Sequence, residues 1–318
     1  MNAVFWTPSK EDAALQLSTV DAYIAQNITG LALSSVDPEA ATPYISKALK
    51  QGIITITYDT DAPNSGRLVY IGTDNYKAGY LAGLAAYMIA KEKGYVKPGG
   101  TLKVSIISAS LASLNTMQRV QGFQDAIREC AQKVPDIKGN INIQIIGPYE
   151  DKGDVSAALN FALSILSANP DLQIAFGSNA YEGLPWAQAM KQLGIEPGKV
   201  VLVEFDVTSN TVPPIVERYA YLTVAQREYF MGYYAVWLMY NMTVMDWEQA
   251  LRNFIPGYPA NQTYDTGVDL VGYQHMEFTT PTGEKVAVLS LQEYKQLAIE
   301  LGIPPELLGL ENITSTSS

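Results

Sequence analysis

Apolar and polar residues alternate along the chain in a pattern that predicts strands and helices in turn. Short β-branched or apolar runs, such as 31–33 and 53–57, have the length and composition of buried strands. Between such runs, apolar residues recur at helical spacing, as in 78–89 and 154–168. Repeated strand–helix alternation is typical of a mostly parallel sheet with helices on both faces, so we expect an α/β fold.

The alternation pauses once and then repeats. Gly94 to Gly100, with Pro98-Gly99-Gly100, breaks the first series and is a candidate crossing between domains. The expected strands are 3–6, 31–33, 53–57, 68–71, 102–107, 141–146, 172–176, 200–205, 221–225, 267–273 and 286–289. The expected helices are 9–26, 43–52, one that follows Asn75, 115–131, 154–168, 181–194, 213–219, 227–242 and 291–301. Helix 227–242 is rich in aromatic residues, and we interpret it as a packed helix rather than a binding face.

Composition narrows the function. The 318 residues suffice for two domains, and a net charge of −11 argues against nucleic acid as a partner, because such binding relies on Lys and Arg. One cysteine, Cys130, permits no internal disulfide, and one histidine, His275, leaves little for a metal site or a base. No apolar run has the length of a membrane span, no basic-then-apolar signal pattern opens the chain, and common catalytic and cofactor motifs are absent. We expect neither a metal nor a cofactor.

Polar side chains follow several of the expected strands. Asp59 follows strand 53–57, and in open α/β sheets the carboxyl edge of the strands is where ligands bind. The other candidates are Asn179, Asp206 and Gln226 at later strand ends, Asn115 and Arg119 one turn apart near a helix start, and Tyr149 as an aromatic wall. Carboxylates, an amide and a guanidinium fit the hydroxyls of a sugar, and a buried Arg119 would need Asp59 or Asp206 nearby. Cap, turn or surface roles are the alternative interpretation of each residue.

The sequence resembles a known family, the ribose-binding-like, type I periplasmic sugar-binding proteins of bacterial ABC importers. The phrases that carry the resemblance are Tyr58-Asp59-Thr60-Asp61-Ala62-Pro63, Ile71-Gly72-Thr73-Asp74-Asn75, Arg119 with Gly122-Phe123, Phe176-Gly177-Ser178-Asn179, Phe205-Asp206-Val207-Thr208 and Val224-Ala225-Gln226. The resemblance implies two doubly wound parallel-sheet lobes with a ligand cleft between them that closes on binding. Its expected boundaries are 1–97 with 227–262 for the first lobe, 98–226 with 263–310 for the second, and a disordered tail at 311–318.

The resemblance also assigns roles and a location. It makes Asp59 the carboxylate of the first lobe, Arg119, Asn179 and Asp206 the polar contacts of the second, and Gln226 a contact beside a hinge. It implies a monosaccharide or polyol as ligand, the membrane permease of an ABC importer as partner, and a periplasmic or extracytoplasmic location. Asn115 and Tyr149 match positions that contribute in some members.

One departure from the family pattern concerns the beginning of the chain. Family members open with an additional strand and helix, ahead of the unit that lies at 3–26 here, and this additional pair supplies ligand contacts. The additional strand and helix are missing from the sequence. If the chain is complete, the first lobe lacks an interior strand and one wall of its cleft. A truncation or a misplaced initiation codon would account for the departure equally well.

Two other functions compete with solute capture. The effector-sensing domain of a LacI-type regulator resembles the same fold, although the acidic balance and the lack of a helix-turn-helix ahead of Ala3 argue against it. A sugar-processing enzyme that uses Asp59 and Asp206 as a carboxylate pair ranks last.

Overall fold

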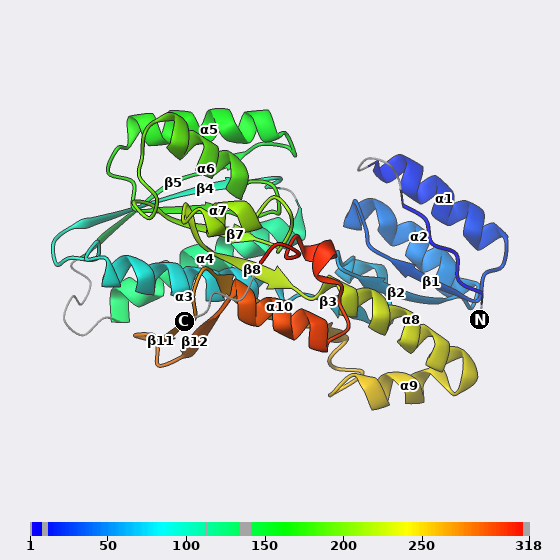
Figure 1. Cartoon of the computed structure of the whole chain (residues 1–318). Helices are drawn as coiled ribbons and strands as arrows, with labels where there is room; N and C mark the ends of the chain where they lie inside the picture. The colour runs from blue at the N-terminus through cyan, green and yellow to red at the C-terminus, as the bar shows by residue number, and fades with distance from the viewer. Residues whose placement is uncertain (1, 8–11, 112, 134–140, 314–318) are drawn as a thin grey trace. The chain divides into compact units, whose positions relative to one another are not determined.

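The chain divides into two compact units. The computed structural model describes residues 2–7, 12–111, 113–133 and 141–313. Unit 1 consists of Met1–Asp74 and Arg227–Gly267, and unit 2 consists of Asn75–Gln226 and Val268–Ser318 (Figure 1). The first crossing therefore falls after Asp74, not after residue 97 as expected.

Unit 1 contains a parallel sheet covered on both faces. Its elements are α1 (Ala13–Ala25), β1 (Gly30–Leu33), α2 (Pro38–Lys50), β2 (Ile54–Tyr58), the 3-10 turn η1 (Pro63–Ser65), β3 (Tyr70–Gly72), α8 (Glu228–Val244), α9 (Trp247–Phe254) and β9 (Thr263–Asp265). The four strands pair in parallel in the order β1-β2-β3-β9. Helices α1 and α2, blue in Figure 1, pack on one face of this sheet, and α8 and α9, yellow, pack on the other.

Unit 2 contains a larger, mixed sheet. Its elements are α3 (Asn75–Glu92), β4 (Thr101–Ser108), α4 (Leu114–Lys133), β5 (Asn142–Glu150), α5 (Val155–Ala168), β6 (Ile174–Gly177), α6 (Gly183–Gln192), β7 (Val201–Phe205), α7 (Val212–Val216), β8 (Ala220–Gln226), β10 (Val268–Gly272), β11 (Met276–Thr279), β12 (Lys285–Ser290), α10 (Leu291–Glu300) and η2 (Pro305–Leu308). The eight strands lie in the order β11-β12-β10-β8-β7-β6-β4-β5, with β4 to β8 mutually parallel and β10 antiparallel to β8. The expected α/β fold with parallel sheets is confirmed.

Helix α3 belongs to unit 2 because it packs along α4 at very short range. A Cβ on Gly79 would lie 2.0 Å from the backbone oxygen of Arg119, and one on Gly122 would lie 2.1 Å from that of Tyr76. Only glycine allows two helix backbones to approach so closely. The expected break at Gly94–Gly100 is therefore a connection inside unit 2, between α3 and β4.

Several expected elements differ from the structure. Residues 3–6 form no strand, and Val4 and Phe5 are 69% and 82% exposed. A short apolar run such as Ala3 to Trp6 does not form a strand unless a neighbouring backbone pairs with it. The sequence analysis missed α9, whose cap Asp246 accepts a hydrogen bond from the Gln249 N–H, and the short strands β9 and β11. Of the expected tail, 314–318 lies outside the described residues.

Helix α8 packs as expected on one side only. Met231, Ala235, Leu238 and Met242 are buried against the sheet of unit 1. On its other side, the side chains of Tyr229, Tyr233, Trp237 and Tyr240 are between 42% and 52% exposed. The helix is apolar around most of its circumference, and the sheet covers only part of it.

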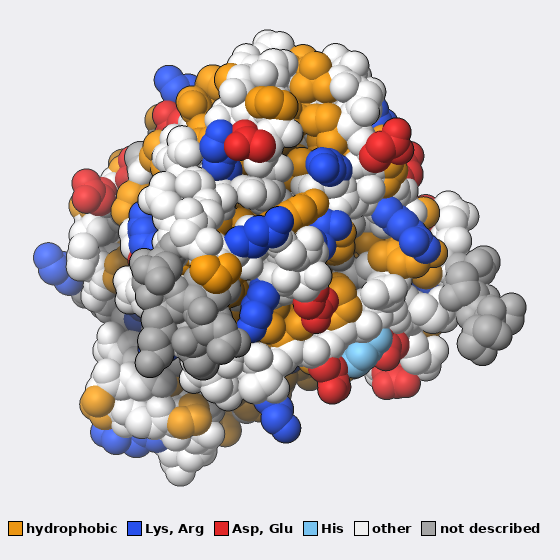
Figure 2. Space-filling model, turned by 90° about the vertical axis from the view of Figure 1, so that its left-hand side faces the viewer, with side chains coloured by type: hydrophobic (Ala, Val, Ile, Leu, Met, Phe, Trp, Pro, Cys, Tyr) orange, Lys and Arg blue, Asp and Glu red, His pale blue; other side chains and the backbone are white. Residues whose placement is uncertain are grey.

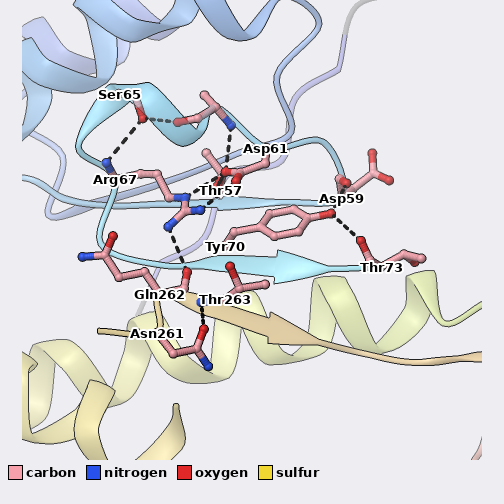
Figure 3. Close-up of polar contacts among 11 residues, drawn as sticks. Thr57, Asp59, Asp61, Ser65, Arg67, Tyr70, Thr73, Asn261, Gln262 and Thr263 are labelled. Carbon is pink, nitrogen blue, oxygen red and sulfur yellow. Dashed lines mark hydrogen bonds and ion pairs between the residues drawn. The ribbon is translucent and has the colours of Figure 1, made fainter. Parts of the chain in front are cut away.

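A buried ion pair fixes the turn that follows β2 in unit 1. The Arg67 guanidinium donates to both carboxylate oxygens of Asp61, at 2.8 and 2.7 Å, and to the backbone oxygen of Gln262 at 2.8 Å (Figure 3). Thr57 Oγ1 and the Ala62 N–H also donate to Asp61. This pair therefore joins the turn at 60–67 to the distant segment that precedes β9.

Two glutamates lie fully buried in unit 2. Along β7, Val203 and Phe205 face the helices α3 and α4, whereas Glu204 faces the opposite cluster beneath α6. Neither carboxylate oxygen of Glu204 has a hydrogen-bond partner among the described residues. Burial raises the pKa of the Glu204 carboxyl well above its usual value, and burial followed by the nearby Asp151 charge does the same for Glu182.

We expect Asp61→Ala to lower the free energy of unfolding of the chain by about 3–5 kcal/mol, because it leaves the Arg67 charge buried without its partner. Chemical denaturation would measure this loss. Asp21→Ala is the matched control, since Asp21 and its partner Lys47 are each about half exposed and the change should cost no more than about 1 kcal/mol. Equal effects of the two variants would contradict the assignment.

We also expect the stability of the chain to fall as pH rises above the ordinary glutamate pKa. Burial raises the pKa of Glu204 in the folded state above its unfolded value, so its contribution to stability is complete below the unfolded pKa and is lost as pH rises through the folded one. One such group contributes a slope of up to about 1.4 kcal/mol per pH unit. Chemical denaturation at a series of pH values gives the free energy of unfolding of Glu204→Gln from acid to neutral pH. This free energy should depend less steeply on pH than that of the wild type. An unchanged pH dependence would refute Glu204 as its origin.

Candidate functional site

Asp59 lies at the carboxyl end of β2 in unit 1, in an unusual backbone conformation. Its φ of 58° is in the left-handed region, which non-glycine residues seldom adopt. The Tyr70 hydroxyl lies 2.7 Å from the Asp59 backbone oxygen, and Ser34 Oγ donates to the carboxylate at 2.7 Å. In Figure 3 the Asp59 carboxylate points away from the Arg67–Asp61 pair. Backbone contacts thus hold this carboxylate at the strand end, outside the structural ion pair.

Arg119 is the centre of a polar network in unit 2. It projects from the second turn of α4 and is only 4% exposed. Its Nε donates to Asn75 Oδ1 at 2.8 Å, Nη1 to the Ser178 backbone oxygen at 3.1 Å, and Nη2 to Gln226 Oε1 at 3.0 Å. Its Cζ lies 3.9 Å from the centre of the Phe205 ring, a cation–π contact. Four different elements therefore fix the guanidinium plane.

Asp206 is linked to Arg119 through Gln226. The Gln226 amide donates from Nε2 to Asp206 Oδ1 at 2.6 Å while its own oxygen accepts from Arg119. The expectation that a buried Arg119 has an acidic neighbour is met by this relay: Asp206 lies one side chain away. Asp206 has a φ of 66°, and its backbone oxygen accepts from Thr211 and Thr223 hydroxyls at 2.8 and 2.6 Å. Like Asp59, it lies at a strand end with its backbone in the left-handed region.

Asn179 enters the network through the loop between β6 and α6. Ser178 Oγ donates to Asn179 Oδ1 at 2.8 Å, and the backbone oxygen of Ser178 accepts from Arg119. The expected residues Arg119, Asn179, Asp206 and Gln226 thus lie together in unit 2, within a chain of direct contacts.

Two expected site residues have other contacts. Asn115, the second residue of α4, accepts through Oδ1 from the Thr116 N–H at 2.9 Å and from the Ser113 hydroxyl, so its side-chain contacts are local. The Tyr149 ring stacks on Phe161 at 5.3 Å and is 36% exposed, at the outer strand β5. Their part in a binding site stays a prediction.

The sequence analysis missed three contributors to the network. Asn75, Ser178 and Phe205 were named as parts of the phrases that carry the family resemblance and not as site residues, yet all three contact Arg119. Asn75 is 44 residues from Arg119 in sequence, so no local pattern signals that contact.

The network offers a carboxylate, three amide side chains and a guanidinium beside an aromatic ring. Such a set can donate to and accept from hydroxyls on adjacent carbons, which is the pattern that a sugar presents. Among the described residues, no group of three or more His, Cys, Asp or Glu side chains is arranged to hold a metal ion. The chemistry that the side chains of the network offer is hydrogen bonding.

The single histidine, His275, has acidic neighbours. His275 Nδ1 lies 3.1 Å from Glu293 Oε2, and Glu277 is a second neighbour, at 3.5 Å. The hydrogen bond to Glu293 is the main cause that raises the pKa of the imidazole. Figure 2 shows the pale blue histidine beside acidic side chains, and Lys and Arg on that face dispersed among apolar ones.

Within the described part of the chain, no helix is long and apolar enough to cross a membrane.

Comparison with known proteins finds relatives whose names describe sugar-binding proteins. The xylose/arabinose-binding protein of Sulfolobus acidocaldarius is 24% identical over 256 residues, covering 76% of this chain and 58% of the relative. The ribose import binding protein of Bacillus subtilis is 23% identical over 224 residues, covering 70% of this chain and 66% of the relative. The chain thus spans about three fifths to two thirds of the length of these two relatives.

Solved structures agree on the fold. A glucose-galactose binding protein from Geobacillus stearothermophilus matches with a TM-score of 0.64 and 28% identity, covering 80% of each chain. An arabinose binding protein from the same species matches with a TM-score of 0.64 and 27% identity, covering 83% of each chain. The pattern of the periplasmic binding protein domain matches residues 1–244. With its two α/β units and its polar network at strand ends, the chain belongs to the periplasmic binding protein domain family.

Proposed function

We propose that this chain is an extracytoplasmic solute-binding protein that captures a monosaccharide or polyol and delivers it to the permease of an ABC importer. The observation that carries the proposal is the Arg119–Gln226–Asp206 relay, in which a buried guanidinium holds an amide and a carboxylate at the strand ends of unit 2. Preorganised donors and acceptors of this kind lower the cost of ordering side chains on binding. Relatives named for xylose, arabinose and ribose support a sugar as the ligand class.

The proposed mechanism is a shift in population. The proposed ligand contacts are Asp59 and the Arg119 network, and a ligand stabilises the conformation of the chain that it binds most tightly. That ligand-bound conformation is then the species that a permease recognises. Asp59 and Asp206 are suited to ligand contact, since the surrounding contacts maintain their strained backbone at the strand ends.

No covalent step is needed for this function. The relatives named above are binding proteins, and we propose that this chain is likewise not an enzyme. The name of the Bacillus subtilis relative includes import, which favours transport over the transcriptional regulator considered as an alternative. The name of the matching domain supports a periplasmic or extracytoplasmic location.

We expect pentoses or hexoses to raise the melting temperature of the chain, because a ligand that binds only the native state stabilises it in proportion to the logarithm of its concentration. A thermal-shift screen of D-xylose, L-arabinose, D-ribose, D-glucose, D-galactose and polyols would measure this. A ligand at 100 times its Kd should add about 2.7 kcal/mol. The absence of any shift across the whole panel would argue against sugar binding.

We expect Asp206→Ala to weaken binding of the sugar found in that screen by about 2–5 kcal/mol, because it removes a charged hydrogen-bond partner from the network. Isothermal titration calorimetry gives the Kd. Asp171→Ala is the control in the same unit, since Asp171 precedes β6, pairs with Lys103 at the surface and should leave the Kd unchanged. A wild-type Kd for Asp206→Ala would exclude Asp206 from the site.

A further inference from the structure

Glu182 is a fully buried carboxylate beside the binding network. Its Oε2 accepts a hydrogen bond from the Asn179 N–H at 2.9 Å, and its own N–H donates to the Asn179 backbone oxygen at 3.3 Å. Oε1 has no hydrogen-bond partner among the described residues. Glu182 therefore contacts both backbone polar groups of Asn179, in the loop between β6 and α6.

The carboxyl group does not cap its own helix. Glu182 stands at the N-cap position of α6, but its side chain accepts no hydrogen bond from the first turn of that helix. An N-cap side chain ordinarily accepts from the N–H two or three residues later. Here the carboxyl turns back to Asn179, so its contact serves the loop and not the helix.

That loop carries two groups of the network. The backbone oxygen of Ser178 accepts from Arg119, and the side chain of Asn179 is an expected ligand contact. Ser178 Oγ further lies 3.0 Å from Ser108 Oγ and 2.8 Å from Asn179 Oδ1. A change in the backbone at Asn179 therefore moves both an acceptor of Arg119 and a candidate ligand group.

Burying the carboxyl group of Glu182 is unfavourable in free energy. An apolar side chain of similar volume would be cheaper to bury, because burial removes a carboxyl from water without full compensation. The groups that act on Glu182 are the Asp151 carboxylate, which disfavours its charged form, and the N–H groups of Ser178 and Asn179 together with Arg119, which favour it. Retaining the acid secures an acceptor for the Asn179 N–H.

We propose that Glu182 is a positioning residue that sets the sugar affinity of the Arg119–Asn179–Asp206 network by holding the backbone of Asn179. The proposal rests on the proposed sugar-binding function. In this proposal Glu182 does not touch the ligand, and it acts by holding the peptide unit between Ser178 and Asn179.

A double-mutant cycle tests this route. Glu182→Met and Glu182→Gln are combined with Asn179→Ala, and calorimetry with D-xylose, or with the pentose that gave the largest thermal shift, yields each Kd. Glu182→Met should raise the Kd at least about tenfold when Asn179 is present and by a clearly smaller factor in the Asn179→Ala background, where only the Ser178 acceptor of Arg119 is still affected. Glu182→Gln retains an acceptor oxygen and should stay within about twofold of wild type. Additive effects, or an unchanged Kd in Glu182→Met, would overturn the proposal.

The control is the other buried glutamate. Glu204 packs against Gly183, at the start of α6, and has no hydrogen bond to the loop among the described residues. Glu204→Gln should alter the pH dependence of stability and leave the Kd at the wild-type value. If Glu182→Met fails to fold, Glu182→Asp replaces it, because the shorter side chain draws the carboxyl away from the Asn179 N–H and should raise the Kd likewise.

Amide hydrogen exchange tests the same contact without a ligand. In Glu182→Met the amide of Asn179 should exchange at least about tenfold faster, while core amides of β6 and β7 keep their protection. Glu204→Gln should leave the Asn179 amide unchanged. Unchanged exchange in Glu182→Met would refute the positioning role, whereas wild-type protein that binds no sugar would refute only the function on which it rests.

Discussion

The buried guanidinium of Arg119 is the interaction on which the proposed site depends. A charge that is 4% exposed needs several acceptors, and here they come from Asn75 on α3, Ser178 after β6 and Gln226 on β8. Because these acceptors belong to separate elements, the guanidinium fixes the relative positions of a helix pair and two strand ends. The carboxylate of Asp206 accepts from the Gln226 amide, whose own oxygen accepts from Arg119.

Each unit has an aspartate with a left-handed backbone conformation at the end of a strand. Asp59 in unit 1 and Asp206 in unit 2 both adopt positive φ, and in each case a hydroxyl from a neighbouring strand lies close to the aspartate backbone oxygen. Aspartate tolerates the left-handed region better than most residues. In each unit, backbone contacts therefore fix the position of the acid at its strand end.

Buried acids distinguish unit 2 from an ordinary apolar core. Glu204 occupies an inward position of β7 with no partner among the described residues, and Glu182 uses one oxygen on Asn179. Burial raises the pKa of both carboxyl groups. Glu204 has no contact that explains its retention, whereas the contact of Glu182 lies in the loop that carries Asn179.

The sequence by itself determined the α/β class, most of the strands and helices, and the placement of Asp59, Asn179 and Asp206 at strand ends, because period, turn residues and strand composition are local properties. Only the tertiary structure decided that 3–6 forms no strand and that α3 belongs to unit 2. It also decided that Asn75 and Gln226 hold Arg119. Strand pairing, close helix packing and the partners of a buried charge join residues far apart in the chain, and no local pattern encodes them.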